Sequence, residues 1–205
     1  MATSSPVLAL LLFFSAGVIV PGRTSAGAVP TASPLQQLCG SLGSFYVTPE
    51  LCTSALCSSP TSRCRSAGNT AQLAALAASL AAANATAAKA SLESALSLSL
   101  ARDTERARQA RAPTPLAQAR KGIRSCLQLY EGAVPALRWA ARAVAAGRYR
   151  GAREVLEAAQ YVASGCAGMA GGGEGEAAKL MPLENDRFGS MAIVAHAVVA
   201  SMSAA

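Results

Sequence analysis

Apolar residues recur at intervals of three and four along four long segments, which begin near residues 70, 116, 149 and 184. This spacing places apolar side chains on one face of an α-helix. Four amphipathic helices predict an all-α fold, an antiparallel (up-and-down) four-helix bundle over residues 68–205. The expected core positions are Leu73, Leu76, Leu80, Ala83, Ala87, Leu92, Leu96 and Leu100, then Leu116, Ile123, Leu127, Tyr130, Val134, Leu137 and Val144, then Ala152, Val155, Ala159 and Val162, and finally Phe188, Met191, Val194, Ala195, Val198 and Met202.

Proline and glycine mark the predicted ends of these helices. Residues 113–115 (PTP) end the first helix, Gly147 ends the second, and residues 168–175 form a flexible loop before the fourth. Asn84 is a candidate break in the first helix. Pro135 is expected to kink or locally unwind the second helix, because proline has no amide proton.

The segment before the first long helix, residues 35–65, is dense in cysteine, serine and proline and contains only short apolar pieces. Within it, Thr48, Pro49 and Glu50 fit a helix start, with threonine as N-cap and proline at the first helical position. The segment therefore predicts a small helical hairpin stapled by disulfides. A flexible leader is expected at residues 27–34.

Residues 1–26 are predicted to be a secretory signal peptide. An apolar stretch at residues 7–20 is followed by a small-residue cleavage site at residues 24–26 (TSA). The stretch has about 14 residues, fewer than the roughly 20 that a membrane-spanning helix requires. We therefore expect a secreted chain whose mature form has no membrane segment.

The composition favours helices and argues against a β-sheet protein. The chain has 48 alanines among its 205 residues, and aromatic residues make up only 4%. Alanine has the highest helix propensity, whereas β-sandwiches and barrels fill their interiors with β-branched and aromatic side chains. With 18 basic and 11 acidic residues the formal charge is +7, so the chain is basic but sparsely charged.

All six cysteines follow the predicted signal peptide, as expected for a chain that enters an oxidising compartment. Six cysteines allow 15 connectivities, and the sequence alone does not choose among them. No two cysteines have Cys-x-x-Cys spacing and the chain has one histidine, so no metal site is expected. Local spacing suggests three pairs: Cys39 with Cys52, Cys57 with Cys64, and Cys126 with Cys166.

No catalytic or cofactor-binding site is predicted. His196 lies in the apolar run of residues 192–199, with no nucleophile or carboxylate nearby in sequence, so we expect a partly buried or interfacial histidine. The glycines at 171–173 precede no Lys-Ser or Lys-Thr pair, which argues against a phosphate loop. We therefore expect a binding protein and not an enzyme.

Arginines recur along the second and third long helices. They form either a solvated basic face or a surface that attracts an anionic partner, such as an acidic enzyme cleft or pectin. The series lacks the interleaved aromatic residues of a nucleic-acid site, so no nucleic acid is expected. Asn84, Ala85 and Thr86 form an acceptor sequon, which makes Asn84 a candidate N-glycosylation site in a secreted chain.

The cysteine pattern and the helix layout resemble the plant invertase and pectin methylesterase inhibitors over residues 35–202. Residues 38–52 resemble the N-terminal hairpin of that family, whose first two cysteines pair. The sequence SCLQLYE at residues 125–131 resembles the family's Asp-Cys-x-Glu-Leu-Tyr segment, and Cys166 falls where the fourth family cysteine closes a second bridge. The departures from the family pattern are Ser125, Gly165 and the extra pair Cys57 and Cys64.

The resemblance implies a noncovalent inhibitor that covers an enzyme's substrate cleft. Invertase inhibitors of the tobacco type carry Pro-Lys-Phe at the start of the third bundle helix, where this chain has GRYRG at residues 147–151. The difference favours pectin methylesterase as the partner, in a 1:1 complex in the cell wall (apoplast). Inhibition of cell-wall or vacuolar invertase and non-inhibitory binding of pectin are the alternatives. Candidate partner contacts are Arg138, Arg142, Arg148, Tyr149 and Arg150.

Overall fold

All regular structure in the described part of the chain is helical. A computed structural model describes residues 32–58, 63–106, 115–169 and 181–203, which belong to one unit, Ala32–Ala205. The predicted signal peptide and most of the predicted leader lie outside the described residues, as do residues 170–175 of the predicted loop. The elements are α1 (Pro34–Ser41), the 3-10 helix η1 (Leu42–Phe45), α2 (Pro49–Leu56), α3 (Thr70–Arg106), α4 (Pro115–Ala145), α5 (Tyr149–Met169) and α6 (Leu183–Ser203).

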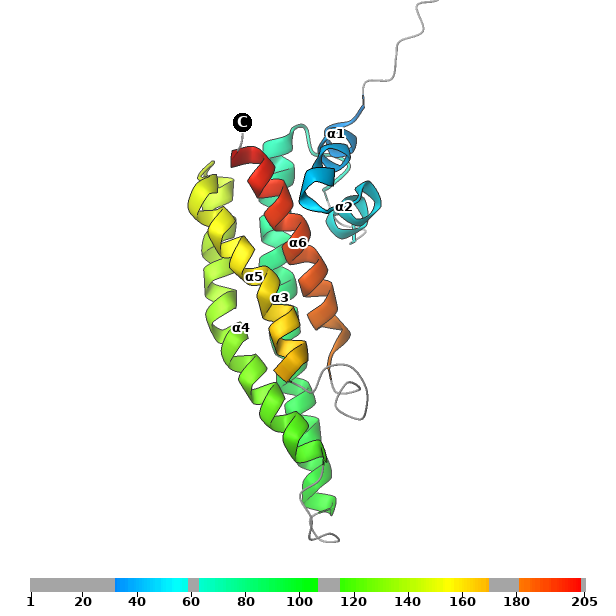
Figure 1. Cartoon of the computed structure of the whole chain (residues 1–205), viewed down its shortest axis with the longest axis vertical. Helices are drawn as coiled ribbons and strands as arrows, with labels where there is room; N and C mark the ends of the chain where they lie inside the picture. Colours follow the sequence, from blue (N-terminus) through cyan, green and yellow to red (C-terminus); the bar gives the residue numbers. More distant parts are fainter. Residues whose placement is uncertain (1–31, 59–62, 107–114, 170–180, 204–205) are drawn as a thin grey trace, which may run out of the picture. The chain divides into compact units, whose positions relative to one another are not determined.

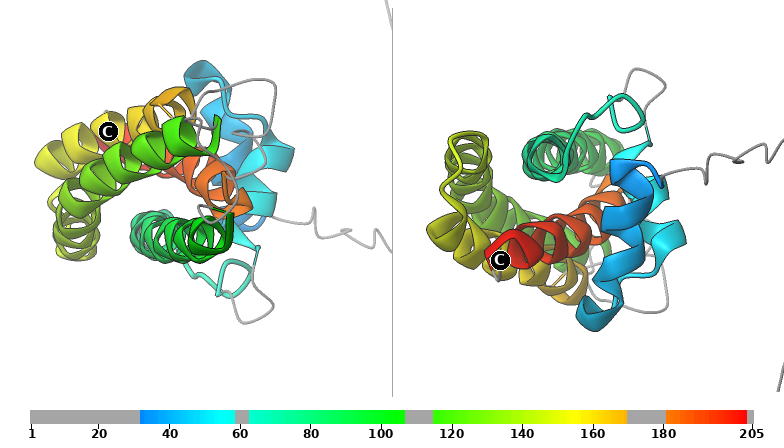
Figure 2. Two further views of the ribbon diagram at one scale, coloured as in Figure 1. Left: turned by 90° about the horizontal axis from the view of Figure 1, so that it is seen from below. Right: turned by 90° about the horizontal axis from the view of Figure 1, so that it is seen from above.

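Helices α3, α4, α5 and α6 form an antiparallel four-helix bundle. In Figure 1 the chain runs down α3, up α4, down α5 and up α6. Helix α3 packs against α4 and α6, and α5 packs against the same two helices, so the four form a closed ring (Figure 2). The predicted fold class is confirmed, and helices that follow one another in the sequence are neighbours in space.

Helices α1 and α2, with η1 between them, form a hairpin. Ser33 caps α1, because its hydroxyl accepts a hydrogen bond from the Gln36 backbone N–H at 3.3 Å, and Pro34 takes the first helical position. Thr48 caps α2 in the same way and accepts from the Leu51 N–H at 3.2 Å. Helix α1 thus begins at Pro34, the last residue of the predicted leader, because serine followed by proline is itself a helix start.

Two disulfides staple this hairpin. Cys39 of α1 is bonded to Cys52 of α2, and Cys57 at the end of α2 is bonded to Cys64. The hairpin packs against α3 and α6 (Figure 2). Its Leu56 is fully buried in the same apolar core as the bundle residues, so hairpin and bundle share one core.

Helix α3 is one helix of 37 residues, and alanines make up the side that faces the core. The predicted stripe is correct at Leu73 and Leu92, which are fully buried, but Ala83, Ala87 and Leu100 are exposed. The predicted break at Asn84 is also wrong, since the helix continues through it. Small side chains let neighbouring helices approach closely, and the leucines at 76, 80 and 96 are only partly buried. The buried stripe consists of Ala74, Ala77, Ala78, Ala81, Ala82, Ala85 and Ala88.

Helix α6 is buried on nearly all sides. Most of its predicted stripe is buried, from Phe188 to Val198, and Met202 is partly buried. Ala197 and Ala200 lie off that stripe and are buried as well. The second face is covered because the hairpin elements α2 and η1 pack against α6. Helix α6 therefore links the hairpin to the bundle.

Helices α4 and α5 are more regular than the sequence predicts. Helix α4 runs through Pro135 without unwinding, and its ribbon bends along its length (Figure 1). Helix α5 continues to Met169, so Gly168 is helical and the predicted loop does not begin there. The last turns of α5 are held in place because Ala163 and Cys166 are buried in the core.

Two contacts join α4, α5 and α6. The disulfide between Cys126 and Cys166 ties α4 to α5, with the two Cα atoms 4.7 Å apart. The Tyr130 hydroxyl of α4 donates to the side-chain oxygen of Asn185 at 2.8 Å, and the Asn185 amide donates to the Ala163 backbone oxygen at 3.1 Å. Burial raises the pKa of Tyr130 well above its usual range, so the hydroxyl keeps its proton and remains a donor.

Replacing Cys126 and Cys166 together with alanine should lower the free energy of unfolding by about 3–4 kcal/mol, because this disulfide closes a loop of 40 residues in the unfolded chain. The matched control, Cys57→Ala with Cys64→Ala, opens a loop of 7 residues and should cost about 2 kcal/mol. Urea unfolding followed by far-ultraviolet circular dichroism measures both losses. A larger loss in the control would contradict the loop-closure explanation.

Candidate binding surface

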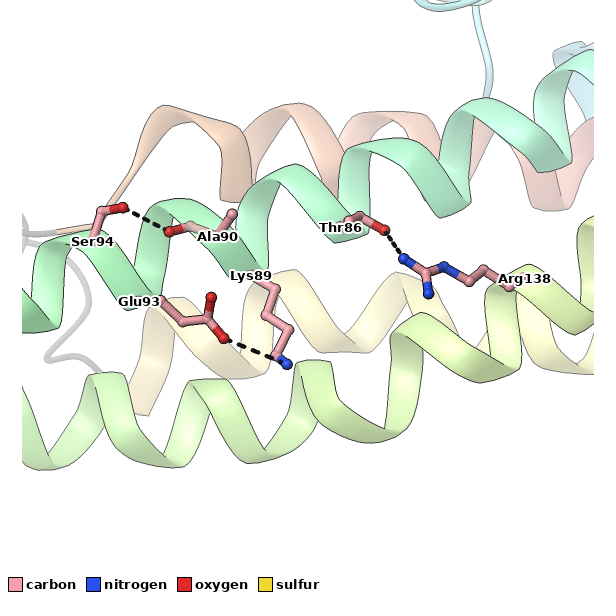
Figure 3. A network of polar contacts seen from close by, with 6 residues as sticks. All are labelled: Thr86, Lys89, Ala90, Glu93, Ser94 and Arg138. Carbon is pink, nitrogen blue, oxygen red and sulfur yellow. Dashed lines mark hydrogen bonds and ion pairs between the residues drawn. The ribbon is translucent and has the colours of Figure 1, made fainter.

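The five candidate contact residues lie on α4 and at the start of α5, but they do not form one patch. Arg138 extends from α4 towards α3, where its guanidinium donates to the Thr86 hydroxyl at 3.4 Å (Figure 3). It therefore lies at the α3–α4 edge of the bundle. Near the turn between α4 and α5 lie the exposed arginines and a partly buried tyrosine that packs on the core: Arg142, Arg148, Arg150 and Tyr149.

The turn that presents these residues is fixed by backbone geometry. Gly147 has φ of 73°, in the left-handed region that glycine adopts without strain. Its N–H donates to the Val144 oxygen at 2.9 Å, and the Arg148 N–H donates to the Ala143 oxygen at 2.9 Å. This is the Schellman pattern of a helix C-terminus, and it satisfies two carbonyls that would otherwise lack partners. Gly147 therefore ends α4, as predicted, and sets the direction in which α5 begins.

An apolar groove of about 360 Å³ lies between α4 and α5. Leu129 and Val162 lie along it, and Leu129 is 39% exposed. The groove is not evident from the sequence, because small residues on two helices form a depression only when the helices pack together. The small residues that line it are Gly132, Ala133, Ala136, Ala158 and Ala159.

Trp139, the only tryptophan in the chain, lies one helical turn beyond Ala136, which lines the groove. Trp139 is 45% exposed, and its indole contacts α5 at Gly151. A Cβ atom at Gly151 would lie 3.1 Å from Cη2 of the indole, which is tighter than normal packing. The glycine therefore allows the indole to approach α5 closely. The signals present in the sequence are the single tryptophan, Trp139, and a glycine near the start of the next helix, Gly151.

This face of α4 and α5 has the chemistry of a protein-binding surface. Tryptophan and arginine are the residue types most enriched among the anchoring residues of protein interfaces. Trp139 and the groove supply apolar contact area. Arg150 lies on another side of α5, where it lines a pocket with Ser203 of α6. Among the described residues, no group of three histidine, cysteine, aspartate or glutamate side chains is placed to hold a metal ion.

His196 is partly buried on α6, as its apolar surroundings in the sequence indicate. Its Nε2 is buried without a hydrogen-bond partner among the described residues. Burial lowers the pKa of His196. Glu157 of α5 raises this pKa in part, and Arg153 of the same helix lowers it further. The folded protein therefore favours the neutral imidazole.

The free energy of unfolding should fall as the pH drops below about 6.5, because the unfolded chain then binds a proton that folded His196 resists. His196→Gln keeps a neutral polar side chain and should remove this part of the pH dependence. Glu157→Gln should make it steeper, since Glu157 favours the protonated imidazole. Urea midpoints of the three proteins at about pH 8 and about pH 5.5 test the expectation. Equal slopes for wild type and His196→Gln would exclude His196 as the cause.

Two further sequence features lie on α3. Asn84 lies in the middle of the helix and is partly buried. Residues Thr70–Leu100 are long and apolar enough to span a membrane by length and composition alone. In the structure, however, the apolar character of this stretch serves packing, because its alanine stripe is buried within the bundle.

Comparison with known proteins gives one result. A family model described as plant invertase/pectin methylesterase inhibitor matches residues 33–198. The matched region begins at the N-cap of α1 and extends into the last two turns of α6, so it covers the hairpin and nearly the whole bundle. No curated protein and no solved structure matches the chain.

Proposed function

Because the chain belongs to the plant invertase/pectin methylesterase inhibitor family, we propose that it is a secreted protein that binds pectin methylesterase noncovalently and covers the enzyme's substrate cleft. Membership implies an inhibitor of one of the two enzymes named in the family description, and not an enzyme. A 1:1 complex in the cell wall would limit the de-esterification of pectin. The inhibitor itself would catalyse nothing.

The sequence at the start of α5 is the observation that favours pectin methylesterase over invertase. Invertase inhibitors of the tobacco type have Pro-Lys-Phe there. In this chain Arg148 lies in the turn, Tyr149 is the first helical residue and Arg150 is exposed. Two exposed arginines suit a partner with an acidic cleft, because complementary charge increases the rate of association and disfavours wrong partners.

In the proposed complex, the groove between α4 and α5, with Trp139 beside it, is the main surface that contacts the enzyme. A stable complex buries roughly 1,200–2,000 Å² and depends on a few anchoring side chains. An anchor that is already ordered loses little conformational entropy on binding. Trp139 is held against Gly151, and the Cys126–Cys166 disulfide ties together the two helices that carry the groove.

Pairing of the cysteines supports secretion. All six form disulfides, and none is free. Structural disulfides persist in oxidising compartments such as the extracellular space. Together with the signal peptide predicted at residues 1–26, this pairing favours an apoplastic protein.

Titration of the mature protein into plant pectin methylesterase and into cell-wall and vacuolar invertase tests the proposal directly. Inhibition of pectin methylesterase at about one inhibitor per enzyme is expected. Inhibition of invertase alone would establish the alternative. A third result, retention on pectin that disappears with added salt and no inhibition of either enzyme, would indicate a non-inhibitory pectin-binding protein that uses its arginines.

Trp139→Ala should weaken binding to pectin methylesterase by about tenfold or more, the size of effect expected for an anchoring aromatic residue. Gly151→Ala should weaken it through the same side chain, because the added methyl group displaces the indole. Leu98→Ala is the matched control: Leu98 is a 61% exposed apolar residue on α3, away from the groove. Dissociation constants from surface plasmon resonance distinguish the variants. Equal affinities for wild type and Trp139→Ala would place the interface elsewhere.

A further inference from the structure

A cleft with both polar and apolar lining lies between the hairpin and the bundle, away from the α4–α5 groove. Its volume is about 600 Å³, and residues of α2, α3 and α6 line it. Met191 forms an apolar part of its wall. The other lining groups include hydroxyls, an amide, a carboxylate and a guanidinium: Ser54, Ser58, Asn84, Asp186, Arg187 and Ser190.

Asn84 is the α3 residue that lines this cleft. Figure 3 shows Thr86 pointing towards α4, where its hydroxyl accepts from Arg138. Residues two apart on a helix point in directions about 200° apart, so Asn84 points away from α4 and towards the hairpin side. Its amide nitrogen Nδ2 donates one hydrogen bond, at 2.8 Å, to the Leu80 backbone oxygen. The amide is therefore held in place at the cleft.

The same asparagine begins the sequon Asn84, Ala85, Thr86. We propose that Asn84 carries an N-linked glycan and that the first N-acetylglucosamine of this glycan lies in the cleft between α2, α3 and α6. The inference rests on the secretory route of the proposed function, because the sequon is used only in a chain that enters the secretory pathway.

The covalent step uses a lipid-linked oligosaccharide diphosphate as donor. A bond forms between Asn84 Nδ2 and the anomeric carbon of the first sugar, and the bond from that carbon to the lipid diphosphate breaks. The lipid diphosphate leaves with the bonding electrons, and the amide loses one of its two protons to a base of the glycosyl-transferring enzyme. The remaining N–H can keep the hydrogen bond to Leu80, so modification and the helical structure of α3 are compatible.

The cleft has the mixed chemistry that suits a sugar ring. Serine hydroxyls, Asp186 and Arg187 can exchange hydrogen bonds with ring hydroxyls and the acetamido group, and Met191 offers an apolar surface for the C–H face of the ring. A sugar in this position would contact α2 and α6 at once and would help hold the hairpin on the bundle. The α4–α5 groove is lined by other helices, so the glycan would leave it free.

The first experiment tests attachment. The full chain, and a second version with residues 1–26 replaced by a proven signal peptide, are expressed in secreting plant cells. Both secreted proteins should lose mass on treatment with a peptide N-glycosidase after denaturation. Asn84→Gln and Thr86→Ala should lack that mass, whereas Thr86→Ser retains the sequon and should keep it. An unmodified Asn84 in the secreted protein would refute the inference, whether or not the protein inhibits an enzyme.

The second experiment tests the position of the sugar. The glycosidase should release the glycan at least tenfold more slowly from the native protein than from the reduced, denatured protein. Arg187→Ala, which removes a guanidinium from the cleft wall, should speed native release, and Arg142→Ala on the opposite part of the bundle should not. Equally fast release from native and denatured protein would show that the sugar projects into solvent. If Asn84→Gln inhibits the enzyme as strongly as the wild type does, the glycan is not needed for inhibition.

Discussion

The close packing of alanine faces in the bundle is the constraint on which the rest of the structure depends. Helix α3 buries a continuous stripe of alanines, and α6 buries Ala192, Ala195, Ala197 and Ala200. Side chains this small bring helix surfaces close together and lose almost no rotamer entropy on folding. The two pockets described above lie outside this packed interior, one between α4 and α5 and one at the junction with the hairpin.

A core made of small side chains buries less apolar area per residue than one made of leucines, so other contacts have more to supply. The Cys126–Cys166 disulfide and the Tyr130–Asn185 hydrogen bond do so at one end of α5. At the hairpin, the additional stabilisation comes from two more disulfides and from the packing of the hairpin on α6. Rigidity obtained in this way suits an inhibitor, because a surface that is ordered before binding loses little entropy in the complex.

The sequence predicted the elements and the architecture well, since helix periodicity and capping residues such as Thr48 are local signals. The three disulfides present are the pairs that local spacing suggests. The core face of α3 is only partly predictable, because alanines occur on all sides of this helix and their positions alone do not distinguish buried Ala85 from exposed Ala83 and Ala87. The groove beside Trp139 and the cleft at Asn84 could not be predicted, because each is formed by helices whose relative placement the sequence does not state.

Helix α6 is buried by the bundle on one side and by the hairpin on the other, and this arrangement affects the order in which the chain can fold. The hairpin is the first part of the described domain to be synthesised, and α6, one of the two helices that it packs against, is the last. Its two disulfides join residues only 13 and 7 positions apart and can form early. The part of its docking surface that α6 provides exists only after α6 has been synthesised. Until then the side of the hairpin that faces α6 is exposed, and folding is completed when the first and last helical elements meet.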